Sequence, residues 1–261
     1  MVDSQVRNLP ITPSFPCNDR EFKDRVPLYA AFSAARELLA SIKTDAENFV
    51  KSPPLAIPQT HRRFPNIQSL LRFPNGNERI QFQITESLGD HSPSRLLYVA
   101  STPGPRSETI LVKFARKYGK DLHQFCANEG YAPALLAFEQ LLGDWVGVAI
   151  EYFPLAHCVD ESPLLQDHGD TWLDQMGTMV KQFHSSGYVH GDLRVPNFIA
   201  DGERLLLVDF DWGDKEGHAT FPDIPLLPIL REGRGVMKIT QHHDNMVLAD
   251  TMQEIKGKMG R

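Results

Sequence analysis

The chain is predicted to be an α+β protein in which an antiparallel sheet is followed by a mainly helical part. Between residues 79 and 153, apolar side chains recur at every second position in short segments separated by Gly- and Pro-containing turns, which is the pattern of strands. After residue 153 the apolar spacing changes to three and four, which is the pattern of helices. With 261 residues and 41% hydrophobic content, the chain is long enough to bury a substantial core.

Residues 1–75 are expected to form an N-terminal helical extension and a linker. A helix is predicted over about residues 26–50, where Leu28, Phe32, Leu39 and Ile42 recur at helical spacing. The stretch that follows contains repeated prolines and a turn-like Asn-Gly, so a connecting region with one short helix is expected there.

Residues 76–153 are expected to form an antiparallel sheet of five strands with one helix. The strand segments are 79–85, 95–102, 108–115, 134–140 and 145–153. Lys113 lies within the third of these apolar strands, where a lysine taken alone is usually an edge or snorkelling side chain.

The predicted helix between the third and fourth strands ends at Gly130 and Pro133. Leu122, Phe125 and Glu129 follow at steps of three and four, which places the carboxylate on the apolar face. A carboxylate that faces inward needs a partner, and Lys113 is the nearest candidate along the chain. This pairing would tie the helix to the sheet.

Residues 154–261 are expected to begin with a helix that ends near Gly187, followed by a hairpin. The segments "NFIA" and "LLLVDF" flank the turn "DGER", so pairing brings Asn197 and Asp209 to the same end of the hairpin. Asp192 lies in the loop just before. An amide and a carboxylate suit a magnesium ion, and a further carboxylate can accept or orient a hydroxyl proton.

Two motifs in this region resemble those of a known superfamily. "HGDLRVPN" is similar to the H-x-D-x-x-x-x-N catalytic loop of protein-kinase-like proteins, and "VDFDW" resembles their metal-binding D-F-G element. The upstream order of a strand with a lysine, a helix with a glutamate and a hinge-like "AIEYF" also fits. The resemblance implies a two-lobed kinase-like fold, with an N-lobe over residues 76–153 and a reduced, mainly helical C-lobe over residues 154–261.

The same resemblance implies roles for the residues of the loop and the hairpin. Asp192 would be the catalytic base or hydroxyl-orienting group, and His190 would support the loop by hydrogen bonding. Arg194 would steady the transferred phosphate. Asn197 and Asp209 would bind magnesium, so ATP and Mg²⁺ are the implied cosubstrate and cofactor.

The resemblance also implies that residues of the sheet contact the nucleotide. Lys113, held by Glu129, would contact the phosphates of ATP. Backbone groups of Glu151 and Phe153 would hold the adenine, with Ile150 behind them.

The substrate remains open among three hypotheses. A kinase acting on protein Ser/Thr hydroxyls is favoured by the lysine-glutamate pair. A kinase of a small hydroxylated or amino-bearing metabolite is favoured by Gly191 and Asp211, because H-G-D and D-F-D look more like aminoglycoside, choline and atypical kinases. A pseudokinase binding module is favoured by the poor glycine loop, in which Gly89 stands alone.

Composition limits the partners and the compartment. The net charge of -6 argues against a general nucleic-acid binder, and no apolar run approaches the roughly 20 residues of a spanning helix. Cys17, Cys126 and Cys158 are odd in number and lack CxxC spacing, which favours a reducing compartment, cytosol or nucleus.

One further cluster allows several interpretations. His242, His243 and Asp244 suggest either a metal site or an exposed start of the last helix, expected around residues 243–256. Alternatively, Asp244 braces the catalytic loop from that helix.

Overall fold

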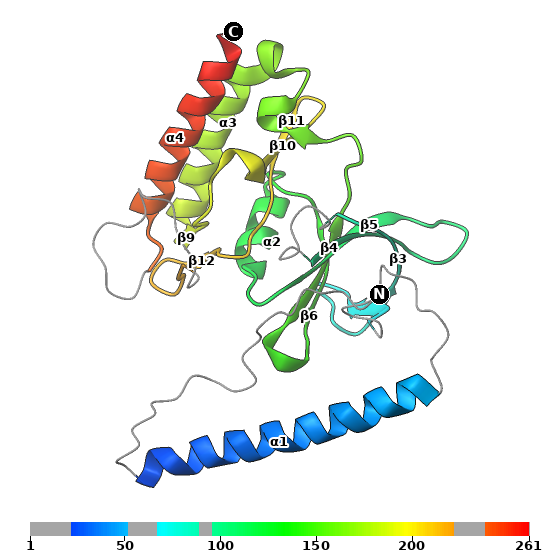
Figure 1. The fold of residues 1–261 in the computed structure, drawn as a ribbon. Helices are drawn as coiled ribbons and strands as arrows, with labels where there is room; N and C mark the ends of the chain where they lie inside the picture. The colour runs from blue at the N-terminus through cyan, green and yellow to red at the C-terminus, as the bar shows by residue number, and fades with distance from the viewer. Residues whose placement is uncertain (1–21, 52–66, 89–95, 222–237, 261) are drawn as a thin grey trace. The chain divides into compact units, whose positions relative to one another are not determined.

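The computed structural model describes residues 22–51, 67–88, 96–221 and 238–260, and the chain separates into two compact units, residues 1–58 and 59–261 (Figure 1). In the first unit the described structure is helix α1 (Phe22–Lys51), which covers the helix predicted over residues 26–50.

The second unit contains the predicted five-stranded antiparallel sheet. Its strands are β3 (Gln83–Ser87), β4 (Leu96–Ser101), β5 (Thr109–Ala115), β6 (Leu135–Gln140) and β7 (Val146–Glu151). They are ordered β3-β4-β5-β7-β6, and every neighbouring pair is antiparallel. On β5, Ile110, Val112 and Phe114 are buried and Lys113 lies on the opposite face, as the alternation of the sequence predicts.

A short hairpin precedes this sheet, within and just after the region expected to be a linker. It pairs β1 (Ser69–Leu71) with β2 (Arg79–Gln81). Leu70 is fully buried in the same hydrophobic cluster as the sheet. A strand of three residues is too short to show a period, so the sequence pattern did not reveal β1.

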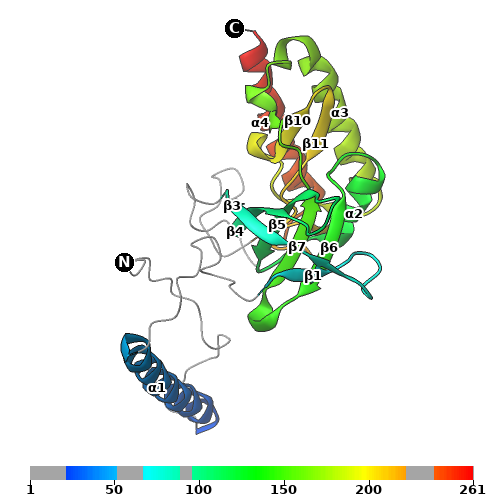
Figure 2. The same ribbon diagram turned by 90° about the vertical axis from the view of Figure 1, so that its right-hand side faces the viewer.

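The rest of the unit is built around two long helices, α3 (Leu165–Ser185) and α4 (Gln241–Met259). They lie side by side and contact each other, with the short helix α2 (Lys120–Asn128) between them and the sheet (Figures 1 and 2). Apolar residues from both long helices, among them Trp172, Met176, Phe183 and Leu248, are buried in one cluster.

Short strands and 3₁₀ turns make up the connections, with η2 joining β6 to β7 and the others lying between β7 and α4. These are η2 (Leu142–Asp144), β8 (His157–Cys158), η3 (Val159–Glu161), β9 (Tyr188–Val189), η4 (Val195–Asn197), β10 (Phe198–Asp201), β11 (Arg204–Leu207) and β12 (Asp214–Lys215). β10 and β11 form the predicted hairpin, with Asp201 paired to Arg204 at the turn. β8 pairs with β10, and β12 pairs with β9.

Two further expectations from the sequence concern membrane-spanning helices and the cysteines. Within the described residues, none of the helices has both the length and the apolar character that crossing a membrane requires. Cys126 and Cys158 are free thiols, whereas Cys17 lies outside the described residues.

Candidate active site

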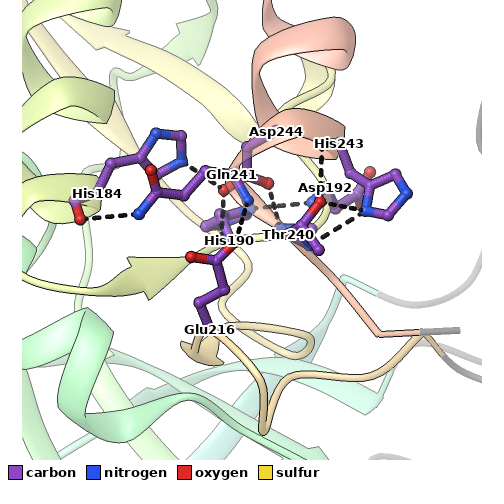
Figure 3. A network of polar contacts seen from close by, with 9 residues as sticks. His184, His190, Asp192, Glu216, Thr240, Gln241, His243 and Asp244 are labelled. Carbon is purple, nitrogen blue, oxygen red and sulfur yellow. Dashed lines mark hydrogen bonds and ion pairs between the residues drawn. The ribbon is translucent and has the colours of Figure 1, made fainter.

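The loop after β9 is held by a buried carboxylate from α4. Asp244 is 1% exposed, and it accepts hydrogen bonds from the backbone N–H of His190 (2.8 Å) and of Gly191 (2.7 Å) (Figure 3). His184 Nε2 lies 3.0 Å from the same carboxylate. Asp244 therefore braces the loop, in agreement with one of the sequence hypotheses.

The alternative hypothesis of a metal site at this helix start is not supported. Among the described residues no group of three or more His, Cys, Asp or Glu side chains could hold a metal ion. Instead Thr240 caps α4: its N–H donates to His243 Nδ1 (3.1 Å), and its hydroxyl accepts from the His243 N–H (Figure 3). The cap fixes the first turn of the helix, which carries Asp244.

The backbone conformation and the packing at position 191 explain why this residue is glycine. Its φ of +82° is in the left-handed region, and a Cβ there would lie 2.5 Å from Ile239 Cδ1. The backbone turn and the close packing of Ile239 both require glycine at the middle position of H-G-D.

Asp192 is 8% exposed and is held on both sides. Both of its carboxylate oxygens accept hydrogen bonds from Arg194, one from Nε and the other from Nη2 at 2.8 Å. The backbone C=O of Asp192 accepts from Asn197 Nδ2 at 2.7 Å. Each carboxylate oxygen keeps a second lone pair for a ligand, and the pairing raises the pKa of Arg194.

His190 is fully buried behind Asp192. Its Nδ1 accepts the Asp192 N–H at 3.2 Å, so the neutral ring carries its proton on Nε2. Burial lowers the pKa of His190, and the surrounding carboxylates of Asp244, Asp192 and Asp209 oppose that shift. The ring also packs edge-on against Phe210, with centroids 5.3 Å apart.

The Lys113 side chain extends from β5 to the segment that follows the β10–β11 hairpin. Its Nζ lies 2.7 Å from Asp209 Oδ1 and 2.6 Å from Asp211 Oδ1, and its side chain is 14% exposed. Burial would lower the pKa of Lys113, but these two carboxylates outweigh it and raise the pKa. The lysine is thus a buried cation rather than an edge side chain.

Glu129 does not hold Lys113, which corrects the sequence expectation. Glu129 is exposed at the C-cap of α2. The buried face of α2 consists of Leu122, His123 and Cys126, so the helix is rotated relative to the stripe inferred from sequence. Because Asp209 and Asp211 pair with Lys113, the DFD motif itself supplies the carboxylate partners.

His123 takes the inward position on α2. Its Nε2 lies 2.8 Å from the Pro133 C=O and its Nδ1 lies 2.7 Å from the Tyr118 hydroxyl. A carbonyl only accepts, so Nε2 donates and Nδ1 accepts in the neutral ring. Burial lowers the pKa of His123 to about 4, and the ring stacks on Phe210 with centroids 4.4 Å apart. A histidine beside a leucine on a short helix carries no signal that periodicity could detect.

Asp209 has a strained backbone. Its φ is +65°, which costs a non-glycine residue on the order of 1 to 3 kcal/mol. The residues on either side fix it: Val208 N–H donates to the Asn197 C=O (2.9 Å), and the Phe210 C=O accepts from the Gly119 N–H (2.8 Å). Strain of this kind is concentrated at functional sites.

The donor chemistry at the hairpin end fits a magnesium ion. The Asn197 amide nitrogen donates to the Asp192 C=O, which leaves the amide oxygen as a potential ligand. The backbone C=O of Asn197 accepts from the N–H of Val208, the residue before Asp209. Two protein oxygens are a common set for Mg²⁺, which takes its other ligands from water and phosphate. Asn197 is 2% exposed, so its orientation is fixed by packing.

The residues of the expected hinge lie at the end of β7 and just after it. The Glu151 N–H donates to the Ala134 C=O (3.0 Å), and the Phe153 C=O accepts from the Ala156 N–H (3.2 Å). Ile150 is half-buried on the same strand. The contact of these groups with adenine stays a prediction, and Gly89 of the expected phosphate loop lies outside the described residues.

No protein-family model matches the chain. Short sequence matches exist to curated proteins from Methanosarcina mazei and Methanosarcina acetivorans, each described as a probable bifunctional tRNA threonylcarbamoyladenosine biosynthesis protein. Each is 43% identical over 56 residues, 21% of this chain. The chain spans about a tenth of the length of these relatives.

The structure is similar to that of the Cydia pomonella granulovirus kinase PK-1. The TM-score is 0.54 at 15% sequence identity, and the alignment covers 67% of this chain and 70% of the viral one. The five-stranded antiparallel sheet and the helices α2, α3 and α4 agree with that likeness. The chain therefore has a protein-kinase-like fold.

Proposed function

We propose that the protein is an ATP- and Mg²⁺-dependent phosphotransferase that acts on hydroxyl groups, with protein Ser/Thr side chains as the substrate. The observation that carries the proposal is the convergence of four polar residues from separate elements. Lys113 of β5 contacts Asp209, and Asn197 contacts the backbone of Asp192.

In the proposed reaction the substrate hydroxyl is oriented by the free lone pairs of Asp192. The hydroxyl oxygen forms a bond to the γ-phosphorus while the bond from that phosphorus to the bridging oxygen of ADP breaks, and the hydroxyl proton passes to Asp192. Lys113 and Arg194 supply positive charge to the phosphate oxygens. Asn197 and Asp209 would hold Mg²⁺, which neutralises charge on the phosphates when bound.

Mg-ATP requires a rearrangement of the Lys113 contacts in this scheme. Asp209 Oδ1 is engaged by Lys113, so Lys113 must turn toward the phosphates for Asp209 to take the metal. Asp211 is the second partner of Lys113 and can retain it during this exchange. Asp211 would thus serve in the role that the sequence analysis expected of Glu129.

The alternatives are a kinase of a small metabolite and an inactive binding module. The likeness to the granulovirus kinase PK-1 supports phosphotransfer by this fold, and the protein-kinase-like fold favours a protein substrate. The H-G-D and D-F-D motifs favour a small one. The tRNA-related names of the archaeal relatives rest on a match over a fifth of this chain, so the proposal does not include tRNA modification.

A thermal-shift titration with ATP, with and without Mg²⁺, tests the nucleotide site. Ligand that binds only the folded protein raises its melting temperature, so we expect a magnesium-dependent rise that Asp209→Asn abolishes. Asp174→Asn, an exposed residue of α3, is the matched control and should keep the rise. An absence of any rise in the wild type would contradict the proposal.

Turnover is tested with γ-labelled ATP. Label on an added protein or peptide supports the proposed substrate, and label on an added metabolite supports the alternative. A magnesium-dependent thermal shift with no label on any acceptor, including water, would indicate a binding module.

A further inference from the structure

The large apolar side chains of helix α1 are exposed. Phe32, Leu39 and Ile42 are between 52% and 68% exposed, and the hydrophobic clusters of the described residues contain none of them. α1 is one continuous helix of 30 residues, so these side chains lie along a single rod (Figure 1). An exposed apolar stripe of this kind marks a surface that binds another protein element.

The stripe has the spacing of a coiled-coil seam. Apolar residues follow one another at alternating steps of four and three, at Leu28, Phe32, Ala35, Leu39, Ile42, Ala46 and Phe49. The mean step is 3.5 residues and continues for about three heptads, which is the period of two helices that supercoil around each other. The element that fits the stripe is therefore another α-helix.

The central part of the seam is complementary to itself when it is read backward. If two copies of α1 lie antiparallel with their midpoints at residue 37, Phe32 of one copy meets Ile42 of the other, and Ala35 meets Leu39. Each of these alanines then faces a leucine, so the thickness of the core varies little along the seam. A parallel pair would place alanine on alanine and phenylalanine on phenylalanine, which leaves a gap beside a bulge.

The flanks of the seam add one attraction and one repulsion to this arrangement. Tyr29 and Lys43 are exposed, and in the antiparallel register each Lys43 lies beside Tyr29 of the other copy, where its ammonium group can stack on the ring. The two Arg36 side chains lie beside the two-fold axis and repel each other. Removal of the Arg36 charge should therefore strengthen this pairing.

We propose that α1 is a self-association surface, and that it binds α1 of a second copy of the chain in antiparallel orientation. The self-complementary order of large and small residues selects a second copy as the partner. The inference goes beyond the proposed phosphotransfer and does not depend on it, because α1 lies in the first of the two units and every candidate site residue lies in the second. Such a dimer links two copies of the kinase-like unit.

Size-exclusion chromatography with light scattering tests the association on the full-length protein. We expect the mass to rise from that of a monomer to twice that value as the concentration increases. Leu39→Gln changes two layers by symmetry and should weaken the dimer about tenfold or more, while the exposed position keeps the fold intact. Leu142→Gln, the same change at a leucine of η2 that is 95% exposed, should leave the dimer unaltered.

Disulfide cross-linking tests the orientation. Residues rise about 1.5 Å each along a helix, so in the antiparallel register residue 32 is level with residue 42 of the other copy, whereas two copies of residue 32 are about 15 Å apart along the axis. A disulfide needs Cα atoms within about 7 Å. With an added oxidant, a mixture of the Phe32→Cys and Ile42→Cys proteins should therefore form cross-linked dimers, and neither protein alone should do so. The wild type gives the background from the native cysteines.

The outcomes are decisive for the surface and for its orientation. A monomer at every concentration, or a dimer that Leu39→Gln leaves unchanged, would overturn the inference. Cross-linking of each single-cysteine protein with itself would show a parallel pair and overturn the antiparallel arrangement. Arg36→Gln should strengthen the dimer, and weaker association of that variant would contradict the register. None of these results depends on nucleotide, so the magnesium-dependent ATP shift tests the proposed function separately.

Discussion

At the scale of single residues, one buried carboxylate fixes the conformation of the proposed catalytic loop, residues 190–197. Asp244 accepts hydrogen bonds from the backbone N–H groups of His190 and Gly191. Its carboxylate also lies within hydrogen-bond distance of His184 Nε2, and all three partner residues are buried. Asp192 follows Gly191 directly, so its position depends on the hydrogen bonds that Asp244 accepts. Asp244 is a positioning residue.

Asp244→Asn should therefore destabilise the fold. The amide has only one acceptor oxygen, so one buried backbone N–H loses its partner, and we expect a loss of about 2 to 4 kcal/mol in the free energy of unfolding. Urea denaturation measures it. Asp174→Asn, which is exposed on α3, should stay within about 0.5 kcal/mol of the wild type. Equal stabilities of the two variants would contradict the bracing role.

His123 should make stability fall in acid. Its pKa is about 4 in the folded protein against 6.5 for the free side chain, so the unfolded chain binds the proton more tightly. The stabilising contribution is complete above pH 6.5 and is lost as the pH falls toward 4, by at most about 1.4 kcal/mol per unit.

The comparison with His123→Gln isolates this effect, because His190 and His243, whose pKa values are also lowered, are present in both proteins. Between about pH 7.5 and pH 5, the wild type should lose about 2 kcal/mol more than the variant. Parallel pH profiles in urea denaturation would show that His123 is not held neutral.

At the scale of elements, α2 docks on the DFD segment without a linking ion pair among the contacts described. The contact is the stack of His123 on Phe210 together with the close approach of two glycines, Gly119 and Gly213. The Gly119 N–H donates to the Phe210 C=O at 2.8 Å. Helix position and motif conformation are therefore coupled through packing.

Gly119→Ala tests this approach. Gly119 has an ordinary φ of -80°, but a Cβ would lie 2.2 Å from the Gly213 carbonyl oxygen, so backbone must move. We expect a loss of about 1 to 3 kcal/mol and a weaker Mg-ATP thermal shift. In contrast, Gly177→Ala in α3, where nothing lies within 4 Å, should stabilise by about 0.5 to 1 kcal/mol. Similar effects of both substitutions would contradict the packing argument.

At the scale of the whole molecule, the site belongs to one of two units. Within the described part of the chain, the hydrophobic clusters draw only on residues from Ile67 onward, and every candidate site residue lies there as well. Residues 1–58 form a separate unit by their contacts.

A protein reduced to residues 59–261 should therefore keep its fold. We expect its melting temperature to stay within about 2 °C of that of the full chain, since no residue of these clusters is lost, and its magnesium-dependent ATP shift to persist. Thermal melts followed by circular dichroism, with and without Mg-ATP, measure the melting temperatures of both proteins. Unfolding of the shortened protein would show that the first unit supplies part of the core.

The sequence by itself determined the presence of the five strands and the polar hairpin. Alternation of apolar residues defines β3 to β7, and Asn197 and Asp209 flank a short turn, so their proximity follows from local pairing. Asp192 lies a few residues away on the same segment. These features depend on neighbours along the chain, which periodicity and turn chemistry describe well.

Only the tertiary structure decided which distant groups meet. Lys113 lies 96 positions from Asp209, and its expected partner Glu129 proved to be exposed because a short helix can rotate without breaking its apolar pattern. The brace from Asp244 was one hypothesis among several, because Asp244 lies 54 positions from His190. Such contacts depend on how elements dock, which local periodicity does not specify.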